Sequence, residues 1–423
     1  MHIIDKTKDL WNIEKGNAKK TLLKLVMAVP FWLIVASLAL MAFGIGRAIY
    51  LTDKRSDQKV AEVWQSGSDT SFRHMVVYGG GIRSEGETSP MTYQEGGKSI
   101  HVADIALMRQ ALQNSADTGS AASKKNLTYT EGSNLRGWED CYSSTVMASL
   151  EATEVHDGLE VTIGKADAQL VAVGGNFKAF HPFRYLSGGF LPVTPVDMNQ
   201  IVINDVLAWK FYHSYDVIGN RILINGEMFT IIGVVEENTG KIAELAGEQE
   251  NRAFIYFGSL GTIYGNNSGS DDSEEPGVSS APADYAIQCY EAVLPELVKG
   301  VGVTDFKNAL PSYSLSNPQL YVSNNTGRFG VTRIFDTVFP LGESDRERMG
   351  YEFPYWEKAA QLTEDRLFYD YILTGFGIVL LLIGVVATGL KFRAKKAADP
   401  EEPDFSGYSD EDEKQANELL LKE

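Results

Sequence analysis

The 423-residue sequence predicts an α+β fold in which two transmembrane helices, extended by an antiparallel helical stalk, carry a mixed α+β extracytoplasmic core. Three observations lead to this prediction. Two isolated stretches are apolar and long enough to cross the ~30 Å hydrocarbon core of a bilayer. The region between them combines short apolar strands with amphipathic segments. Lysine and arginine concentrate on the N-terminal side of the first stretch and on the C-terminal side of the second. Basic residues beside a membrane span stay in the cytoplasm, so both chain termini are predicted to be cytoplasmic.

Residues 1–24 are predicted to form a cytoplasmic amphipathic helix. The segment carries six lysines against three acidic residues, and its apolar side chains fall roughly on one helical face. These side chains are Ile3, Ile4, Leu10, Trp11 and Ile13. The alternative, a basic retention segment without a partner, stays open.

Residues 25–46 are predicted to form the first transmembrane helix, because these 22 residues contain no charge. Pro30 lies one turn into the stretch, where a missing amide donor does least damage. A cleavable signal peptide is the competing interpretation. The long segment before the apolar stretch and the lack of a clear A-x-A cleavage site favour a retained anchor.

Residues 47–371 are predicted to be extracytoplasmic and to hold both the stalk and the core. Residues 48–64 are helix-compatible and would continue the first span, and residues 356–371 would lead without a break into the second. Pro354 and Glu357 are start signals for that second helix. Two helices that leave the membrane side by side imply an antiparallel stalk.

The clearest unit of the core covers residues 200–236. It begins with the apolar strand QIVIN, followed by an amphipathic helix capped by Asn204 or Asp205. Asn225-Gly226 then separates two alternating apolar runs, which is the strongest short-range signal for a β-hairpin. A further helix is expected over residues 101–113, and further strands are expected at residues 159–163, 169–173, 253–257, 286–294 and 319–322.

Residues 372–390 are predicted to form the second transmembrane helix, and residues 391–423 an acidic cytoplasmic tail that begins with a basic cluster. Gly375, Gly377 and Gly384 offer a candidate helix-packing face, because small residues allow close approach of membrane helices. The alternative is that they reflect the ordinary glycine content of a membrane span.

The sequence lacks recognisable catalytic, nucleotide-binding and metal-binding motifs, so it predicts a protein that is not an enzyme and has no cofactor. It contains no Walker A loop. The run 186–189, LSGG, matches the start of the signature loop of ABC ATPases, but Pro192 and Pro195 follow where that loop requires a helix. The six histidines show no zinc-ligand spacing. The net charge of −18 argues against nucleic acid as a partner, because phosphate contacts need clustered basic residues.

Cys141 and Cys289 are a candidate disulfide, because both would lie in an oxidising exterior. The alternative is a pair of buried small apolar residues. The acidic run within residues 265–282 lacks the alternating Asp/Asn spacing and the final Glu of a calcium loop, so a solvated loop without metal is expected there.

The order of span, stalk, α+β core and span resembles the first half of permeases that bear a MacB-like periplasmic core domain, the MacB/FtsX class of ABC transporters. Within residues 169–236, QLVAVGGNFKAFHPFRYLSGGFLP resembles the family segment that ends in a GRxF-type turn. The following QIVINDVLAWKFYHSYDVIGNRILINGEMFTIIGVV resembles its strand, helix, IG turn and hairpin. Residues 100–112, 324–336 and 354–366 are more weakly similar, and the last two are like Gram-positive members.

This resemblance implies a non-catalytic membrane subunit that couples a separate cytoplasmic ABC ATPase to an extracytoplasmic domain, for export or for envelope mechanotransmission. Residues 3–20 would then contact the ATPase. Family permeases have four spans and this sequence offers two, so a four-span permease or an adaptor-like subunit is a further expected partner beside the lipid bilayer. The expected location is the plasma membrane of a Gram-positive bacterium. An autonomous membrane-anchored sensor or binding module without an ATPase stays open as the alternative.

Overall fold

The computed structural model describes residues 29–66, 71–79, 100–120, 137–156, 159–265, 285–296, 298–311, 320–338 and 353–398. The chain divides into two compact units, one formed by Met1–Ala48 with Tyr369–Glu423 and the other by Ile49–Phe368. The predicted amphipathic helix at residues 1–24, the run at 266–282 and most of the C-terminal tail lie outside the described residues.

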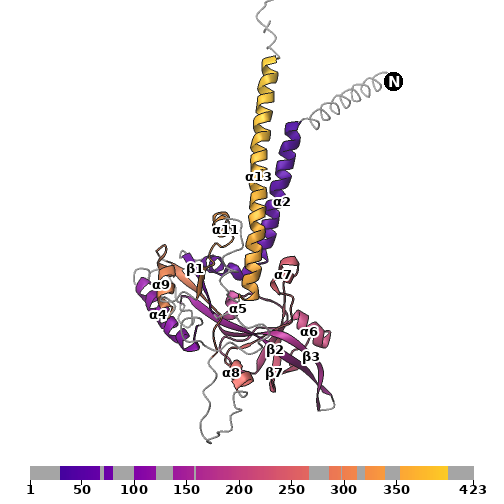
Figure 1. Cartoon of the computed structure of the whole chain (residues 1–423), viewed down its shortest axis with the longest axis vertical. Helices are drawn as coiled ribbons and strands as arrows, with labels where there is room; N and C mark the ends of the chain where they lie inside the picture. The colour runs from indigo at the N-terminus through magenta and orange to yellow at the C-terminus, as the bar shows by residue number, and fades with distance from the viewer. Residues whose placement is uncertain are drawn as a thin grey trace, which may run out of the picture. The chain divides into compact units, whose positions relative to one another are not determined.

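The first unit contains two helices that pack side by side and run antiparallel (Figure 1). They belong to α2 (Val29–Asp53) and α13 (Tyr355–Ala398). Among the described residues, these two helices are long and apolar enough to cross a membrane. Gly384 contacts α2 near Ile34, Gly377 contacts it near Met41, and Gly44 contacts Thr374, which sets the antiparallel register.

The second unit, here called the head, is built on a mixed sheet of ten strands among the described residues. Neighbouring strands follow the order β10-β1-β9-β2-β3-β8-β5-β7-β4, and β6 pairs with β2 and β7. The β3–β8 and β5–β7 pairs are parallel and the others are antiparallel. The strands are β1 (Ser71–Tyr78), β2 (Glu139–His156), β3 (Leu159–Gly175), β4 (Arg184–Gly188), β5 (Gln200–Asn204), β6 (Arg221–Ile224), β7 (Glu227–Glu236), β8 (Arg252–Tyr256), β9 (Cys289–Glu296) and β10 (Tyr321–Asn324).

Hydrophobic side chains cover both faces of this sheet, because alternate residues of a strand point to opposite sides. On one face they pack against α4 (Val102–Ser120), α6 (Asp205–Tyr212), α8 (Ser259–Gly265) and α9 (Val301–Ala309). On the other face they pack against α3 (Val60–Gln65), α5 (Phe177–Phe180) and the first residues of α13. Two further helices of the head are the single 3-10 turn η1 (Ser56–Gln58) and α11 (Val331–Val338), and α7 (Lys241–Ala246) precedes β8.

The unit at residues 200–236 is confirmed. Asn204 caps α6, with its side chain accepting a hydrogen bond from the backbone of Leu207 at 3.0 Å. Asn225 and Gly226 have φ angles of 49° and 89°, as a type I′ turn between β6 and β7 requires. The mixed α+β prediction is thereby confirmed for the head.

Three strands were not expected from the sequence: β1, β2 and β4. The sequence of β2, EDCYSSTVMASLEATEVH, contains many small polar residues, and several of them are buried in the interior of the sheet. The two strands predicted at 159–163 and 169–173 are instead one continuous strand, β3, which pairs with β2 over almost its whole length. A strand of this composition lacks the alternation of apolar and polar residues that marks a half-buried strand in a sequence.

The first predicted stalk segment, residues 48–64, is not one continuous helix. α2 ends at Asp53, η1 covers Ser56–Gln58, and α3 begins only at Val60. The break places the side chain of Arg55 in the interior of the head, where it forms a buried ion pair. A buried charge of this kind requires its partner, so the chain departs from helical geometry at this point. The second segment, residues 356–371, lies within the unbroken helix α13.

Candidate functional site

Buried charged and amide side chains concentrate in the part of the head where the chain after α2 meets the first turns of α13. We call this group the junction layer, and it consists of Arg55, Gln58, Glu248, Arg328, Glu357 and Glu364. All six side chains are at most 5% exposed. Charged groups are rarely buried in proteins unless they are paired, and here each pairs across segments far apart in the sequence.

Arg328 lies at the centre of the junction layer, in the turn that follows β10. Its guanidinium forms a bidentate ion pair with Glu357, with N–O distances of 2.5 and 2.6 Å. Its Nε donates to Glu364, two turns further along α13, at 2.6 Å. Burial alone would lower the pKa of Arg328, but the two carboxylates hold that pKa well above its ordinary value. One cation thus joins two successive carboxylates on one face of α13 to the sheet.

Gln58 of η1 extends the same network toward the first helix. Its side-chain oxygen accepts hydrogen bonds from Arg328 at 2.9 Å and from Asn325 at 3.1 Å. The hydroxyl of Tyr78, on β1, donates to Glu357 at 2.7 Å. The segment after α2, the end of β10, strand β1 and helix α13 therefore share one set of buried hydrogen bonds.

A second ion pair anchors the segment after α2 on the other side of the layer. Both terminal nitrogens of Arg55 donate to the carboxylate of Glu248, which lies between α7 and β8. Both side chains are 3% exposed. Lys54 also donates to the backbone oxygen of Thr239 at 2.9 Å. The residues that follow α2 are thus fixed to the head by paired charges and not only by apolar contact.

Arg252 forms a third buried pair beside the first turn of α13. It donates to Glu237 at 2.5 Å and to the backbone oxygen of Gly247 at 2.6 Å. Its guanidinium also lies over the ring of Tyr355, 3.5 Å from the ring centre, a cation–π arrangement. Burial raises the pKa of Glu237 to about 7, although the guanidinium of Arg252 acts in the opposite direction.

A cavity of about 420 Å³ opens between these pairs. Residues on its wall include Asp57, His181, Glu237, Glu248, Tyr355 and Trp356. Burial raises the pKa of Asp57, while the charges of His181 and Arg55 lower it. The wall is therefore rich in carboxylates but also contains aromatic surface.

A second polar group lies deeper in the head, and we call it the His–Cys–Glu cluster: His74, Cys141, His181, Cys289 and Glu291. All five residues are at most 4% exposed. Nε2 of His74 lies 2.9 Å from one oxygen of Glu291, and Nε2 of His181 lies 2.8 Å from the other. Burial alone would raise the pKa of Glu291, but His181 and His74 hold it well below its ordinary value. Burial raises the pKa of both thiols well above the usual range.

The residues singled out from the sequence fall in different places. Gly377 and Gly384 contact α2 of the same chain, whereas Gly375 has no such neighbour within 4 Å of an added Cβ. Cys141 and Cys289 come together on neighbouring strands as free, buried thiols, so the structure contains no disulfide between them. The disulfide stays a prediction. Ile3, Ile4, Leu10, Trp11 and Ile13 lie outside the described residues.

The junction layer was not expected from the sequence. Glu357 and Glu364 are seven residues apart, and this spacing places both on one face of a helix. It is the sequence pattern that could have pointed to the junction layer. Arg328 follows Gly327, whose φ of 63° marks a tight turn. Nothing in the spacing of Arg55 and Glu248 connects them, because they are separated by 193 residues.

Comparison with protein families matches residues 75–274 to the MacB-like periplasmic core domain. The match covers just under half of the chain and includes β2 to β8 of the head. The resemblance to the MacB-like periplasmic core domain found in the sequence is thereby confirmed for residues 75–274. No curated protein matches the sequence.

Three solved structures illustrate the likeness at low identity. The periplasmic region of MacB from Actinobacillus actinomycetemcomitans is 13% identical, with a TM-score of 0.34 over 64% of this chain and 94% of that one. The extracellular domain of the noncanonic ABC-type transporter YknZ from Gram-positive bacteria is 13% identical, with a TM-score of 0.33 over 59% and 100%. A domain of a putative permease from Porphyromonas gingivalis is 13% identical, with a TM-score of 0.25 over 60% and 87%.

Proposed function

We propose that this chain is a non-catalytic membrane subunit of a MacB/FtsX-like ABC transporter assembly. In this proposal α2 and α13 cross the plasma membrane, both termini are cytoplasmic, and residues 47–371 lie outside. The observation that carries the proposal is the match of residues 75–274 to the MacB-like periplasmic core domain, in a chain that has an apolar helix of spanning length on each side of it.

The packing of the two helices supports their pairing as one transmembrane element. Gly377 and Gly384 allow close approach to α2, as small residues do between membrane helices. Arg47 and Asp370 form an ion pair at 3.5 Å within the same unit. We infer that the two helices move together and not as independent anchors.

The junction layer supports a mechanical role for the head. Breaking a buried ion pair by removing one partner costs about 3–5 kcal/mol, so Arg328 and Arg55 fix the chain that follows α2 and the first turns of α13 to the sheet. A displacement of these helix ends would therefore reach β1 and the end of β10 instead of being absorbed by a flexible linker. This is the behaviour needed to couple a cytoplasmic ATPase to an outer domain.

The expected partners are a separate ABC ATPase, contacted by residues 3–20, and a four-span permease or adaptor-like subunit. The test is affinity purification of the tagged full-length chain from its native membrane in a mild detergent, with mass spectrometry of the retained proteins. We expect a stoichiometric ABC ATPase that is lost when residues 3–20 are deleted. Deletion of residues 405–423 is the matched control and should leave the ATPase bound. Recovery of the intact chain without an ATPase would contradict the proposal.

A second candidate function is an autonomous membrane-anchored sensor or binding module. The cavity of about 420 Å³ favours it, because its size falls within the range of small-molecule sites. Its wall combines the rings of Tyr355 and Trp356 with acidic side chains and with the basic side chains of Lys54 and Arg184, a mixed surface that suits a small polar ligand. Purification of the chain with an extracellular ligand but no ATPase would favour this second function.

A further inference from the structure

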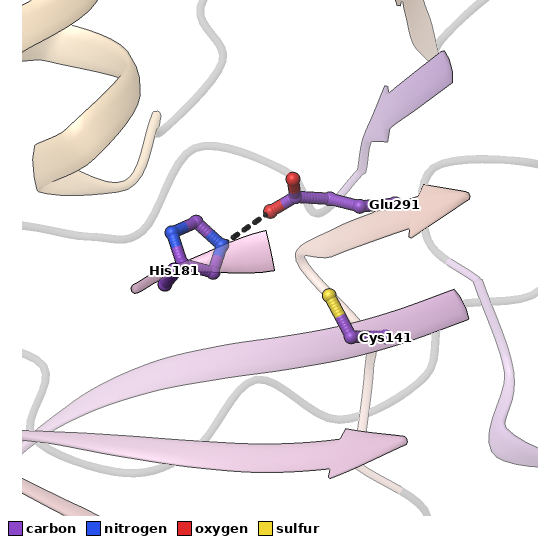
Figure 2. A group of neighbouring side chains, drawn as sticks. All are labelled: Cys141, His181 and Glu291. Carbon is purple, nitrogen blue, oxygen red and sulfur yellow. Dashed lines mark hydrogen bonds and ion pairs between the residues drawn. The ribbon is translucent and has the colours of Figure 1, made fainter. Parts of the chain in front are cut away.

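We propose that Cys141, His181, Cys289 and Glu291 bind one zinc ion inside the head, with His74 as an outer hydrogen-bond partner of Glu291. The candidate ligand atoms of Cys141, His181 and Glu291 all lie within 4.8 Å of one another. Figure 2 shows the imidazole of His181 and the sulfur of Cys141 directed toward the space beside the carboxylate of Glu291. The proposal concerns the head alone and does not depend on the transport function.

Sheet register explains how residues distant in sequence meet at this point. Cys141 of β2 lies directly opposite Glu291 of β9. Cys289 is two residues from Glu291 on the same strand, so both side chains point to the same face. His74 of β1 lies on that face too, since its neighbours at positions 72 and 76 belong to the same core cluster. His181 reaches the group from the end of α5, which covers this face.

The surroundings make the group exceptional. The face of the sheet that holds it also carries many apolar side chains, among them Phe72, Val76, Phe177 and Trp356. A buried carboxylate can be satisfied by one or two hydrogen-bond donors. Here two thiols and two imidazoles surround a single carboxylate, which is more polar groups than hydrogen bonding alone requires. Sulfur, imidazole nitrogen and carboxylate oxygen together are the donor set that proteins use for zinc.

The distances from Glu291 to its neighbours indicate which of its two oxygens would bind the ion. Sγ of Cys289 lies 3.6 Å from Oε1 of Glu291, the oxygen that also faces His181. In a tetrahedral zinc site, ligand atoms about 2.0–2.3 Å from the metal lie about 3.2–3.8 Å from one another. The ligand atoms of Cys141, His181 and Glu291, which lie within 4.8 Å of one another, would therefore need to approach by about 1 Å. The second oxygen, Oε2, keeps its hydrogen bond to His74 and is thereby held in orientation.

Access and charge are both consistent with a divalent cation. His181 borders the cavity of about 420 Å³, whose wall carries five carboxylates beside Lys54 and Arg184. Zinc replaces the protons of the two thiols, which leave to solvent, and takes Nε2 of His181, whose hydrogen moves to Nδ1. Two thiolates and one carboxylate then offset the double positive charge, and the remaining negative charge faces the N–H of His74.

A Cys141–Cys289 disulfide and the zinc site are mutually exclusive, because the disulfide removes both thiolates. This gives the proposal a direct chemical test. Alkylation of the unfolded chain before and after reduction counts the free thiols, and we expect both thiols to be free in metal-loaded protein. Two oxidised cysteines in protein purified without reductant from its native membrane would overturn the proposal.

The main experiment uses the full-length chain purified in detergent under reducing conditions. We expect elemental analysis to find one zinc per chain, and replacement by Co²⁺ to produce the thiolate-to-cobalt charge-transfer absorption and the d–d bands of a tetrahedral site. The variant Cys141→Ser should lose the charge-transfer absorption and the bound metal. The variant His74→Gln should bind zinc about 10–100-fold more weakly, as loss of an outer-shell partner does.

The matched control is Ser144→Ala, which replaces a buried polar residue on the other face of the same strand. It should retain one zinc and the full cobalt spectrum. Circular dichroism of each variant separates loss of metal from loss of fold, and His181→Asn provides a second ligand variant if Cys141→Ser does not fold. Protein that is folded but metal-free after exposure to excess Zn²⁺, or a folded Cys141→Ser variant with unchanged cobalt absorption, would overturn the proposal.

Discussion

The guanidinium of Arg328 forms a bidentate ion pair with the carboxylate of Glu357, and both side chains are at most 5% exposed. This contact joins the turn after the edge strand β10 to the first turn of the longest described helix. Because the same guanidinium also contacts Glu364, it binds α13 at two points on one face. The start of α13 is therefore held in both position and rotation relative to the sheet.

Replacing Arg328 by alanine should destabilise the head by about 3–5 kcal/mol, because two buried carboxylates would lose their partner. The measurement is denaturant unfolding of the full chain followed by tryptophan fluorescence, since Trp356 lies in the adjoining core cluster. Arg184→Ala is the control, because Arg184 forms an ion pair with Glu236 while 75% exposed. That change should cost at most about 1 kcal/mol. Equal losses for the two variants would refute the assigned role of the layer.

Asn204 is expected to matter more than an ordinary helix cap. Its side-chain oxygen accepts from the backbone of Leu207 and of Arg252, and its nitrogen donates to the backbone of Glu250 at 2.6 Å. Asn204→Ala should therefore cost about 2–4 kcal/mol in free energy of unfolding, from the lost cap and the unpaired backbone groups. Asn220→Ala, at a half-buried turn position, should cost less than about 0.5 kcal/mol. A loss for Asn204→Ala no larger than that of the control would count against this account.

The antiparallel pairing of α2 and α13 predicts a specific cross-link. A Cβ added at Gly44 would lie 3.5 Å from the Cβ of Thr374, within the range of about 3.5–4.5 Å found in disulfides. The double variant Gly44→Cys/Thr374→Cys should therefore form an intramolecular disulfide on mild oxidation. The control pair Gly44→Cys/Gly375→Cys should not, because a Cβ at Gly375 has nothing within 4 Å.

Proteolysis and mass spectrometry of the cross-linked peptides would identify the bond, after free thiols are blocked. A cross-link that forms equally in both double variants would show that the register is wrong. A cross-link that appears in neither would show that the helices are not paired as described.

The buried carboxyl of Glu237 predicts a pH dependence of stability. Its pKa is about 7 in the folded protein against an ordinary value of 4.5, so between these values the folded state holds the proton that the unfolded state has lost. The free energy of unfolding should thus fall as pH rises from about 4.5 to 7, by at most about 1.4 kcal/mol per pH unit. Groups facing this carboxyl are Arg252, Glu248, Asp205 and Tyr355.

Glu237→Gln should flatten the profile in that window, because the amide has no proton to lose. The measurement is the midpoint of chemical unfolding at a series of pH values for both proteins. Identical profiles for the two proteins would assign the dependence to another group.

The sequence predicted the features that local physical chemistry determines. The cap at Asn204, the positive φ angles at Asn225 and Gly226, and the start of α13 after Pro354 all depend on a few neighbouring residues. The junction layer and the His–Cys–Glu cluster could not be predicted from the sequence. Both depend on tertiary contacts between residues that are about 30 to more than 200 positions apart, and no local pattern in the sequence shows which segments become neighbours.

The end of α2 at Asp53 is a second feature that the local sequence pattern does not predict, because a tertiary contact determines it. Residues 48–64 have the periodicity of a helix, and that periodicity predicts continuity. The ion pair between Arg55 and Glu248 overrides it, because a tertiary contact worth several kcal/mol outweighs the small propensity of single residues.

The position of β1 in the sheet has a consequence for biosynthesis. β1 pairs with β9 and β10, whose residues follow it by more than 200 positions. The ribosome synthesises β1 long before β9 and β10. The backbone amides and carbonyls of β1 therefore lack their strand partners while most of the head is translated. Such distant pairing slows folding, and an unpaired strand is a site for aggregation. We therefore expect chains stalled before residue 289 to be held by chaperones or degraded, whereas chains released after residue 324 complete the sheet.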